Sequence, residues 1–263
     1  MEQVSLSCSC HTNKYLSREQ FIDDHIVSYL ISGTNIVNDS IKEYKRVEGC
    51  LTFFRKNRLS KITKVPPVNG EYKSISLKFK QSFLEDFSYE YGYITDGRIS
   101  NDTLLELRLN VMLKNAMESL DFYFGQNENV VQDILTIKAK EILILLLKAN
   151  PELKNVLFDF SQPGKIDLER FMNSNFFFNV SMEKFAYLTG RSLTSFKRDF
   201  KKIFNEAPGR WLTERRLQEA FYLINNTQQK PSDVYLKVGF EDLSHFSFVF
   251  KKQFGVTPSS LLK

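Results

Sequence analysis

Two similar stretches decide the fold: Phe200-Lys201-Lys202-Ile203-Phe204 and, fifty residues later, Phe250-Lys251-Lys252-Gln253-Phe254. A small residue and a proline follow each stretch at the same distance, as Ala207-Pro208 and Thr257-Pro258. Similarity at a fixed interval indicates two copies of one supersecondary unit. We therefore expect a duplicated helical unit in the C-terminal part of the chain.

The first copy has the spacing of a helix-turn-helix. Ser181 is placed to cap a helix over 182–189, and Ser192 is placed to cap a second helix that ends at Phe204. Gly190 lies between them, where a sharp reversal of the chain needs the positive φ that glycine adopts readily.

The second copy follows the same plan. A helix over 233–238 precedes Gly239, and Asp242 is placed to cap a helix over 243–254. Pro208 is expected at the first position of a connecting helix that ends near Asn225. A stiff connector would hold two reading helices about one turn of a DNA duplex, roughly 34 Å, apart.

The charge is unevenly distributed along the chain. Residues 161–263 hold 16 Lys and Arg against 10 Asp and Glu, whereas residues 1–160 hold 20 against 21. A basic C-terminal part indicates a polyanionic partner, although solvated surfaces often carry a similar surplus. The outer face of the second helix in the first copy gathers short polar and long basic side chains, which suit a major groove: Thr194, Lys197, Arg198 and Lys201.

Residues 167–263 resemble the double helix-turn-helix of the AraC/XylS family of bacterial transcription regulators. The resemblance depends on elements that occur in order and at the family's distances: Trp211-Leu212, Arg216-Leu217, Gly239-Phe240, Ser244-His245-Phe246 and Phe254-Gly255-Val256-Thr257-Pro258. Residues 1–160 are similar to the family only in the general layout of its cupin-like effector and dimerisation domain.

The resemblance implies base-reading positions on both recognition helices. Thr194, Lys197 and Arg198 match those of the first helix, and those of the second are Leu243, Ser244 and Ser247. On the same helix, His245 has no nucleophile or carboxylate near it in sequence, so we expect a DNA-facing or packed imidazole rather than a catalytic base.

The chain departs from the family pattern in both copies. Phe248 stands where the family usually has arginine, and Tyr235 where it has a small alanine; Asn205 and Ala207 also differ from the usual Gly and Ser. Phe248 cannot make the bidentate guanine contact of an arginine, which contributes about 1–3 kcal/mol of discrimination. We expect the first unit to carry most of the sequence reading. The second unit is left with three roles: binding the DNA backbone, touching a thymine methyl, or facing RNA polymerase.

The N-terminal part has the pattern of a small β-domain extended by helices. Strands are expected over 26–31, 44–47, 50–55, 61–64 and 72–79, with turn residues between them. Helical spacing follows over 104–124 and 130–148, and the run 142–147 is apolar on all sides. Such a helix is buried in its own domain or pairs with a second copy. Aromatic residues on these strands form plain core or line a pocket: Tyr29, Tyr44, Phe53, Phe54 and Tyr72.

These patterns predict an α+β chain of two domains. Residues 1–160 are expected to form a small β-barrel or sandwich with added helices, and the resemblance implies that this domain is cupin-like, binds an effector and dimerises. After a linker at Ser161-Gln162-Pro163-Gly164, residues 165–263 form an all-α DNA-binding domain of two helix-turn-helix units joined by a long helix.

The composition of the chain argues against several other classes of function. The longest apolar run has six residues, no signal-peptide pattern is present, and Cys is too scarce for a disulfide framework, which favours a cytoplasmic protein. Cys8-Ser9-Cys10-His11 has the form of half a metal site, but no second cluster follows at the usual spacing. We therefore expect a loosely attached tail there, with no metal and no cofactor.

The function predicted is that of a DNA-binding transcription regulator without enzymatic activity. Its expected partners are double-stranded DNA and a second copy of the chain, with a small-molecule or protein effector and RNA polymerase left open. Two other interpretations remain at this point. One is a protein-binding adaptor with weakened DNA binding, and the other is a cupin-type enzyme fused to a DNA-targeting module.

Overall fold

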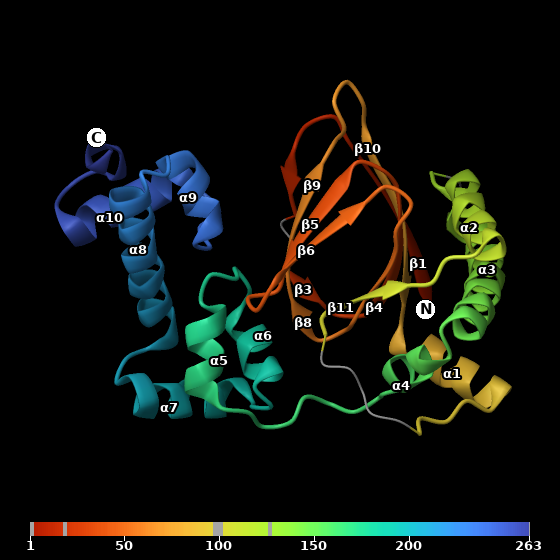
Figure 1. The fold of residues 1–263 in the computed structure, drawn as a ribbon. Helices are drawn as coiled ribbons and strands as arrows, with labels where there is room; N and C mark the ends of the chain where they lie inside the picture. Colours follow the sequence, from red (N-terminus) through yellow and green to blue (C-terminus); the bar gives the residue numbers. More distant parts are fainter. Residues whose placement is uncertain (1–2, 18–19, 97–101, 126–127, 263) are drawn as a thin grey trace. The chain divides into compact units, whose positions relative to one another are not determined.

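The computed structural model describes residues 3–17, 20–96, 102–125 and 128–262, and it divides at Ser161 into two compact units. The strands belong to the first unit, and the second unit is helical (Figure 1). The expected α+β class is therefore confirmed. Among the described helices, none is long and apolar enough to cross a membrane.

The first unit is built on antiparallel sheets whose described strands do not close into a barrel. The larger sheet has the order β1-β10-β4-β7-β11, with bounds Val4–His11, Tyr72–Phe79, His25–Ser32, Leu51–Phe54 and Leu104–Leu107. The second sheet has the order β2-β9-β5-β6, with bounds Tyr15–Leu16, Lys61–Val65, Thr34–Asn38 and Glu43–Val47. A short pair joins β3 (Phe21–Ile22) to β8 (Arg58–Leu59).

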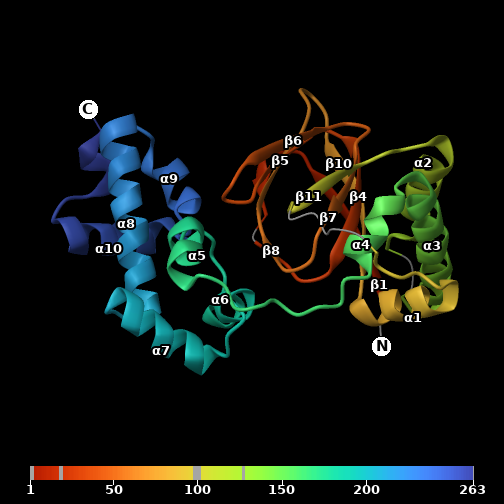
Figure 2. The ribbon, with the colours of Figure 1, turned by 60° about the horizontal axis from the view of Figure 1, so that its bottom comes forward.

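Side chains alternate between the two faces of the larger sheet. Tyr29, Phe53 and Leu77 lie on the face that forms the main core with the helices. Figure 2 shows these helices gathered beside the sheet: α1 (Gln81–Tyr91), α2 (Val111–Glu118), α3 (Glu128–Ala149) and α4 (Lys154–Leu157). Against the second sheet, Phe54 belongs to a smaller apolar cluster that includes Val37.

Helix α3 accommodates its apolar run mainly by burial. Ile142, Leu143 and Leu146 are buried in the main core, whereas Ile144 and Leu145 are only partly buried. Ile137, two turns before Ile144, is exposed. Core burial therefore accounts for much of the run but leaves an apolar edge at the surface.

Two expectations for the first unit are wrong. The segment Cys8-Ser9-Cys10-His11 is not a loose tail, because it ends β1 and pairs in register with β10. The segment 104–124, which was expected to be a helix, begins instead with the strand β11, which pairs with β7. The helix α2 follows, with Asn110 as its cap. Strand partners that lie far away in sequence decide both cases, and local periodicity does not show them.

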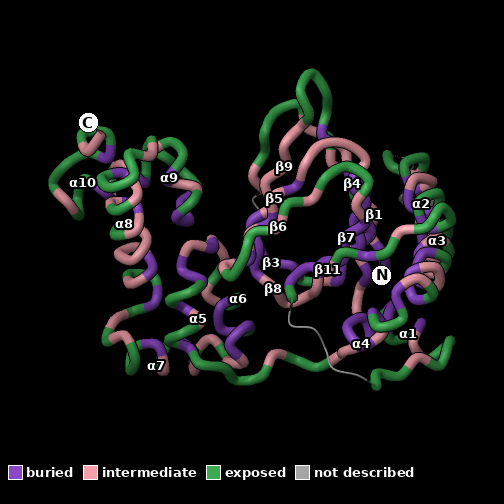
Figure 3. The backbone as a smooth tube through the Cα atoms, viewed as in Figure 1, coloured by how far each residue is buried: buried purple, intermediate pink, exposed green. Residues whose placement is uncertain are grey.

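The second unit contains the expected helices as α6 to α10, and a further helix, α5, precedes them. In chain order the bounds are α5 Leu168–Asn175, α6 Met182–Leu188, α7 Leu193–Phe204, α8 Pro208–Thr227, α9 Pro231–Lys237 and α10 Leu243–Phe254. The predicted caps are confirmed, since the side chains of Ser181, Ser192 and Asp242 accept hydrogen bonds from backbone N–H groups of the helices that they begin. Buried and exposed residues alternate along these helices (Figure 3).

Candidate nucleic-acid interface

Helix α7 is oriented by two phenylalanines, Phe196 and Phe200, which are fully buried. Because residues three and four apart share a face, burial of these two turns the opposite side of the helix outward. The predicted contact residues all lie on that exposed side: Thr194, Lys197, Arg198 and Lys201. The structure therefore brings these four residues together on one accessible face.

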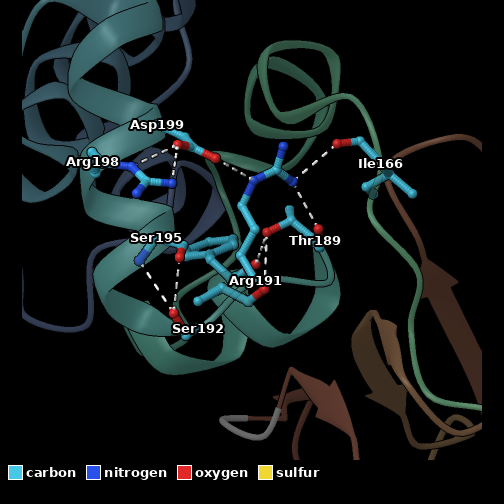
Figure 4. A network of polar contacts seen from close by, with 9 residues as sticks. Ile166, Thr189, Arg191, Ser192, Ser195, Arg198 and Asp199 are labelled. Carbon is cyan, nitrogen blue, oxygen red and sulfur yellow. Dashed lines mark hydrogen bonds and ion pairs between the residues drawn. The ribbon is translucent and has the colours of Figure 1, made fainter.

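A network around Asp199 holds Arg198 at the surface (Figure 4). Arg198 donates from Nε and Nη2 to Oδ1 of Asp199, each at 3.2 Å. Arg191 donates from Nε to Oδ2 at 3.2 Å and from Nη1 to the carbonyl oxygens of Thr189 at 2.7 Å and Ile166 at 3.0 Å. The hydrogen bond from Arg191 is the largest influence that lowers the pKa of Asp199. Arg191 thus positions the carboxylate that orients Arg198, a role that the sequence alone did not reveal.

Helix α10 presents a different surface. Leu243, Ser244 and His245 are exposed in its first turn. Ser247 is half-buried, and its hydroxyl donates to the carbonyl oxygen of Leu243 at 2.8 Å. Phe248 is 68% exposed, although its neighbours in the helix, Phe246 and Phe250, are fully buried.

Helices α7 and α10 can be aligned position by position at the interval of fifty. Lys197 and Arg198 of α7 correspond to Ser247 and Phe248 of α10, so the second face is less cationic than the first. Both helices end with an exposed lysine pair, Lys201-Lys202 and Lys251-Lys252. Such pairs stabilise a helix C-terminus and are also suited to phosphate contact.

Helix α8 connects α7 to the second copy, which contains α10. Its 20 residues correspond to about 30 Å of helix, close to one duplex turn. Trp211, near its start, contacts Phe200 of α7 with ring centroids 5.5 Å apart. Phe221, in its second half, contacts Phe250 of α10 at 6.2 Å. Each recognition helix therefore packs on its own part of the connector (Figure 1).

Arg216 of α8 is half-buried, unlike the exposed arginine Arg210 on the same helix. Its guanidinium donates to the carbonyl oxygens of Phe176 and Phe178 at 2.7 Å each and of Gly239 at 3.0 Å. Burial lowers its pKa to about 10. The three acceptors are backbone carbonyl groups, which every residue has. A single sequence therefore does not indicate that Arg216 binds them.

The cysteines of β1 are adjacent but do not form part of a larger ligand cluster. The sulfur atoms of Cys8 and Cys10 lie 3.8 Å apart. Across the described segments, no group of three or more His, Cys, Asp or Glu side chains is arranged to hold a metal ion.

Comparison with known proteins gives matches for both units. Residues 25–156 match the model of the ExsA N-terminal regulatory domain, and residues 185–263 match the model of a helix-turn-helix domain. The HTH-type transcriptional regulator ExsA of Pseudomonas aeruginosa is 23% identical over 251 residues, which are 95% of this chain and 90% of ExsA. The virulence regulon transcriptional activator VirF of Yersinia enterocolitica is 28% identical over 185 residues, 68% of each chain.

Among solved structures, a crystal structure of apo ToxT from Vibrio cholerae is similar in fold. The TM-score is 0.50 at 15% identity, and the alignment covers 98% of this chain and 96% of ToxT. Together with the matches to both units, this fold defines a bacterial transcription regulator of the helix-turn-helix class. More narrowly, the chain belongs to the AraC/XylS family, and its N-terminal unit is an ExsA N-terminal regulatory domain.

Proposed function

We propose that α7 and α10 enter successive major-groove segments of one DNA duplex, and that the chain thereby regulates transcription in the bacterial cytoplasm without covalent chemistry. In this proposal residues 165–263 bind DNA, and residues 1–160 sense an effector and dimerise. The observation that carries it is the exposed face of α7, where Thr194, Lys197, Arg198 and Lys201 lie together on a helix joined to a connector of about one duplex turn. Ser244, His245 and Leu243 are the corresponding candidates on α10, with Ser247 less accessible.

Selection of bound duplexes from a random pool by the full chain tests this proposal. We expect an enriched motif with two segments about one helical turn apart. Binding to the enriched site should weaken steeply between low and moderate salt, because lysine and arginine contacts release counterions from the phosphates. An unenriched pool, or binding without salt dependence, would contradict DNA reading and favour the adaptor interpretation.

Dimerisation is supported by an apolar strip along α2 and α3. Met112 and Ile137 are exposed, and a surface groove on these helices is lined by apolar residues that include Ile144 and Leu145, with polar residues that include Lys138 and Glu141 at their side. Contiguous apolar surface of this kind marks association sites. We infer that a second copy covers it. Sedimentation should show a dimer that Ile137→Asp dissociates, whereas Val68→Asp, at an exposed apolar residue elsewhere in the unit, should leave the dimer intact. Dissociation by both variants, or by neither, would contradict this assignment.

Effector sensing is supported by polar side chains between the two sheets. Lys64 and Asn35 occupy paired positions of β9 and β5, and the ammonium of Lys64 donates to Oγ of Ser9 on β1 at 2.7 Å. Within the described residues, no ion pair joins Lys64 to a carboxylate, and the buried Oδ1 of Asn35 makes no hydrogen bond. Buried polar atoms without partners are costly.

We therefore infer that a small anionic effector, such as an organic carboxylate, binds in this region. A panel of small carboxylates should contain one that raises the melting temperature of the wild-type protein but not of the Lys64→Met variant. Equal shifts in the two proteins would contradict the assignment, and the absence of any shift would favour a protein effector.

A further inference from the structure

Phe248 is the apolar residue at the centre of the exposed face of α10. At about 100° per residue, it lies about 160° around the axis from each of Phe246 and Phe250, the two fully buried rings of the helix. The core of the second copy is therefore complete without Phe248. An aromatic ring that is 68% exposed contributes little to stability, so packing does not explain it.

The position of Phe248 is that of Arg198 in the first copy. Both follow the capping residue of their helix by six positions, since Ser192 begins α7 and Asp242 begins α10. The Arg198 side chain is 63% exposed, similar to Phe248. If Arg198 reaches a base edge from α7, Phe248 has the same reach from α10, with a ring in place of a guanidinium.

The neighbours of Phe248 fit a nucleic acid better than an apolar protein surface. Ser244 lies one turn before it, and Lys251 and Lys252 lie one turn after it, all exposed. Leu243, the other exposed apolar residue of the helix, is about 140° away around the axis. A protein interface of appreciable area would present a contiguous apolar patch, whereas this ring stands alone among a hydroxyl group and two cations.

The major groove offers one apolar group to such a ring, the C5 methyl of thymine. We propose that Phe248 is a specificity-determining residue that reads a thymine methyl in the DNA segment contacted by α10. The inference depends on the proposed function, because it requires α10 to lie in a major groove. It also assigns different chemistry to the two copies, with polar reading by α7 and methyl reading by α10.

Uracil substitution tests the proposal, because deoxyuridine differs from thymidine only in lacking this methyl. In the motif enriched by the wild-type chain, each thymine is replaced in turn, and binding of the wild-type and Phe248→Ala proteins is compared. At one or two positions of one segment we expect about a fourfold loss for the wild-type protein, the value of one buried methyl-sized group. Phe248→Ala should bind the two duplexes equally, and as an exposed change it should leave the fold intact.

Two further variants sharpen the outcome. Phe248→Arg should shift the selected base at that position from thymine toward guanine, the base that arginine reads. Lys251→Ala should weaken all duplexes alike and keep the thymine–uracil difference.

The possible failures are distinguishable. If a motif is enriched but Phe248→Ala does not remove a thymine–uracil difference at any position, the methyl assignment is wrong. The proposed function is then unaffected. If Phe248→Ala then binds normally but fails to activate transcription by purified RNA polymerase, the ring contacts the polymerase. If no motif is enriched, both the proposed function and this inference are wrong.

Discussion

The guanidinium of Arg216 donates to the carbonyl oxygen of Gly239 at 3.0 Å, and this contact ties the connecting helix α8 to the turn of the second helix-turn-helix. The same side chain bonds the carbonyl oxygens of Phe176 and Phe178, which follow α5. Gly239 allows this approach because a Cβ there would lie 2.9 Å from Nε of Arg216 and 2.7 Å from the carbonyl oxygen of Phe177. One arginine thus joins three segments of the helical unit.

Arg216→Met should strongly destabilise the C-terminal unit. The substitution keeps length and apolar volume but removes the donors to three carbonyl groups, and each buried acceptor left without a partner costs about 1–3 kcal/mol. We expect the free energy of unfolding to fall by about 3 kcal/mol or more. The fluorescence of Trp211, the only tryptophan of the chain, reports unfolding of this unit in urea.

Arg210→Met is the matched control for Arg216→Met. Arg210 lies on the same helix but is exposed and forms surface ion pairs with Glu206 and Glu214. Such pairs contribute less than about 1 kcal/mol. Equal destabilisation by the two substitutions would show that the carbonyl contacts of Arg216 contribute no more to the free energy of unfolding than surface ion pairs do.

Gly190→Ala should destabilise the helical unit and Gly255→Asn should not, although both glycines have positive φ. At Gly190 φ is +64°, and a Cβ would lie 2.4 Å from the carbonyl carbon of Gly164. At Gly255 φ is +76° and nothing lies within 4 Å, while the equivalent residue of the first copy, Asn205, already adopts a φ of 55°. We expect Gly190→Ala to lower the melting temperature by several degrees and Gly255→Asn to change it little. Similar effects of the two would contradict the close contact at Gly190.

The sequence predicted the second unit well because its signals are local. Ser192 and Asp242 cap their helices through backbone groups three residues away, and the interval of fifty supplies an internal comparison. The exposed face of α7 follows from the same helical period. None of these inferences needs a contact between distant segments.

The first unit was predicted less well because its errors depend on distant partners. Cys8 pairs with Ile75, and Leu104 pairs with Phe54. The strand β1 acquires its structure from the first pairing. The strand β11, which lies at the start of a helical sequence pattern, acquires its structure from the second. Arg191 and Arg216 are similar cases, since their acceptors come from other segments.

The buried His25 should make the N-terminal unit less stable in mild acid. Nδ1 of His25 accepts a hydrogen bond from the backbone N–H of Lys56 at 3.2 Å, so the folded protein needs the neutral imidazole. Burial, aided by the charges of Lys56 and Arg55, lowers its pKa to about 3 from an ordinary value of 6.5. The unfolded state therefore takes up the proton first as the pH falls. The contribution of the neutral His25 to the free energy of unfolding is fully present above pH 6.5. It declines below that pH by about 1.4 kcal/mol per pH unit, toward pH 3.

Hydrogen exchange of β4 measures this effect, since the strand begins at His25. Between pH 6.5 and pH 5, after correction for the intrinsic exchange rate, protection should fall in the wild-type protein and less in His25→Phe, whose ring can stack on Phe53 as the imidazole does. His245→Gln, an exposed histidine of the other unit, should behave as the wild type. Protection in His25→Phe that follows the wild-type curve would assign the acid sensitivity to other groups.

Arg198→Ala should reduce sequence discrimination more than it reduces general affinity for DNA. Asp199 holds the guanidinium by two hydrogen bonds of 3.2 Å, which limits its rotamers on the exposed face before any DNA is bound. A base contact made by a preorganised arginine contributes about 1–3 kcal/mol, so binding to the enriched site should weaken about 5- to 150-fold and binding to random duplex much less. Lys202→Ala, one turn later on α7, should instead weaken both duplexes alike and reduce the slope of log affinity against log salt by about 1, as expected for a phosphate contact. If Arg198→Ala behaves in the same way as Lys202→Ala, Arg198 contacts only the backbone, and the choice of site must come from Thr194 and Lys197.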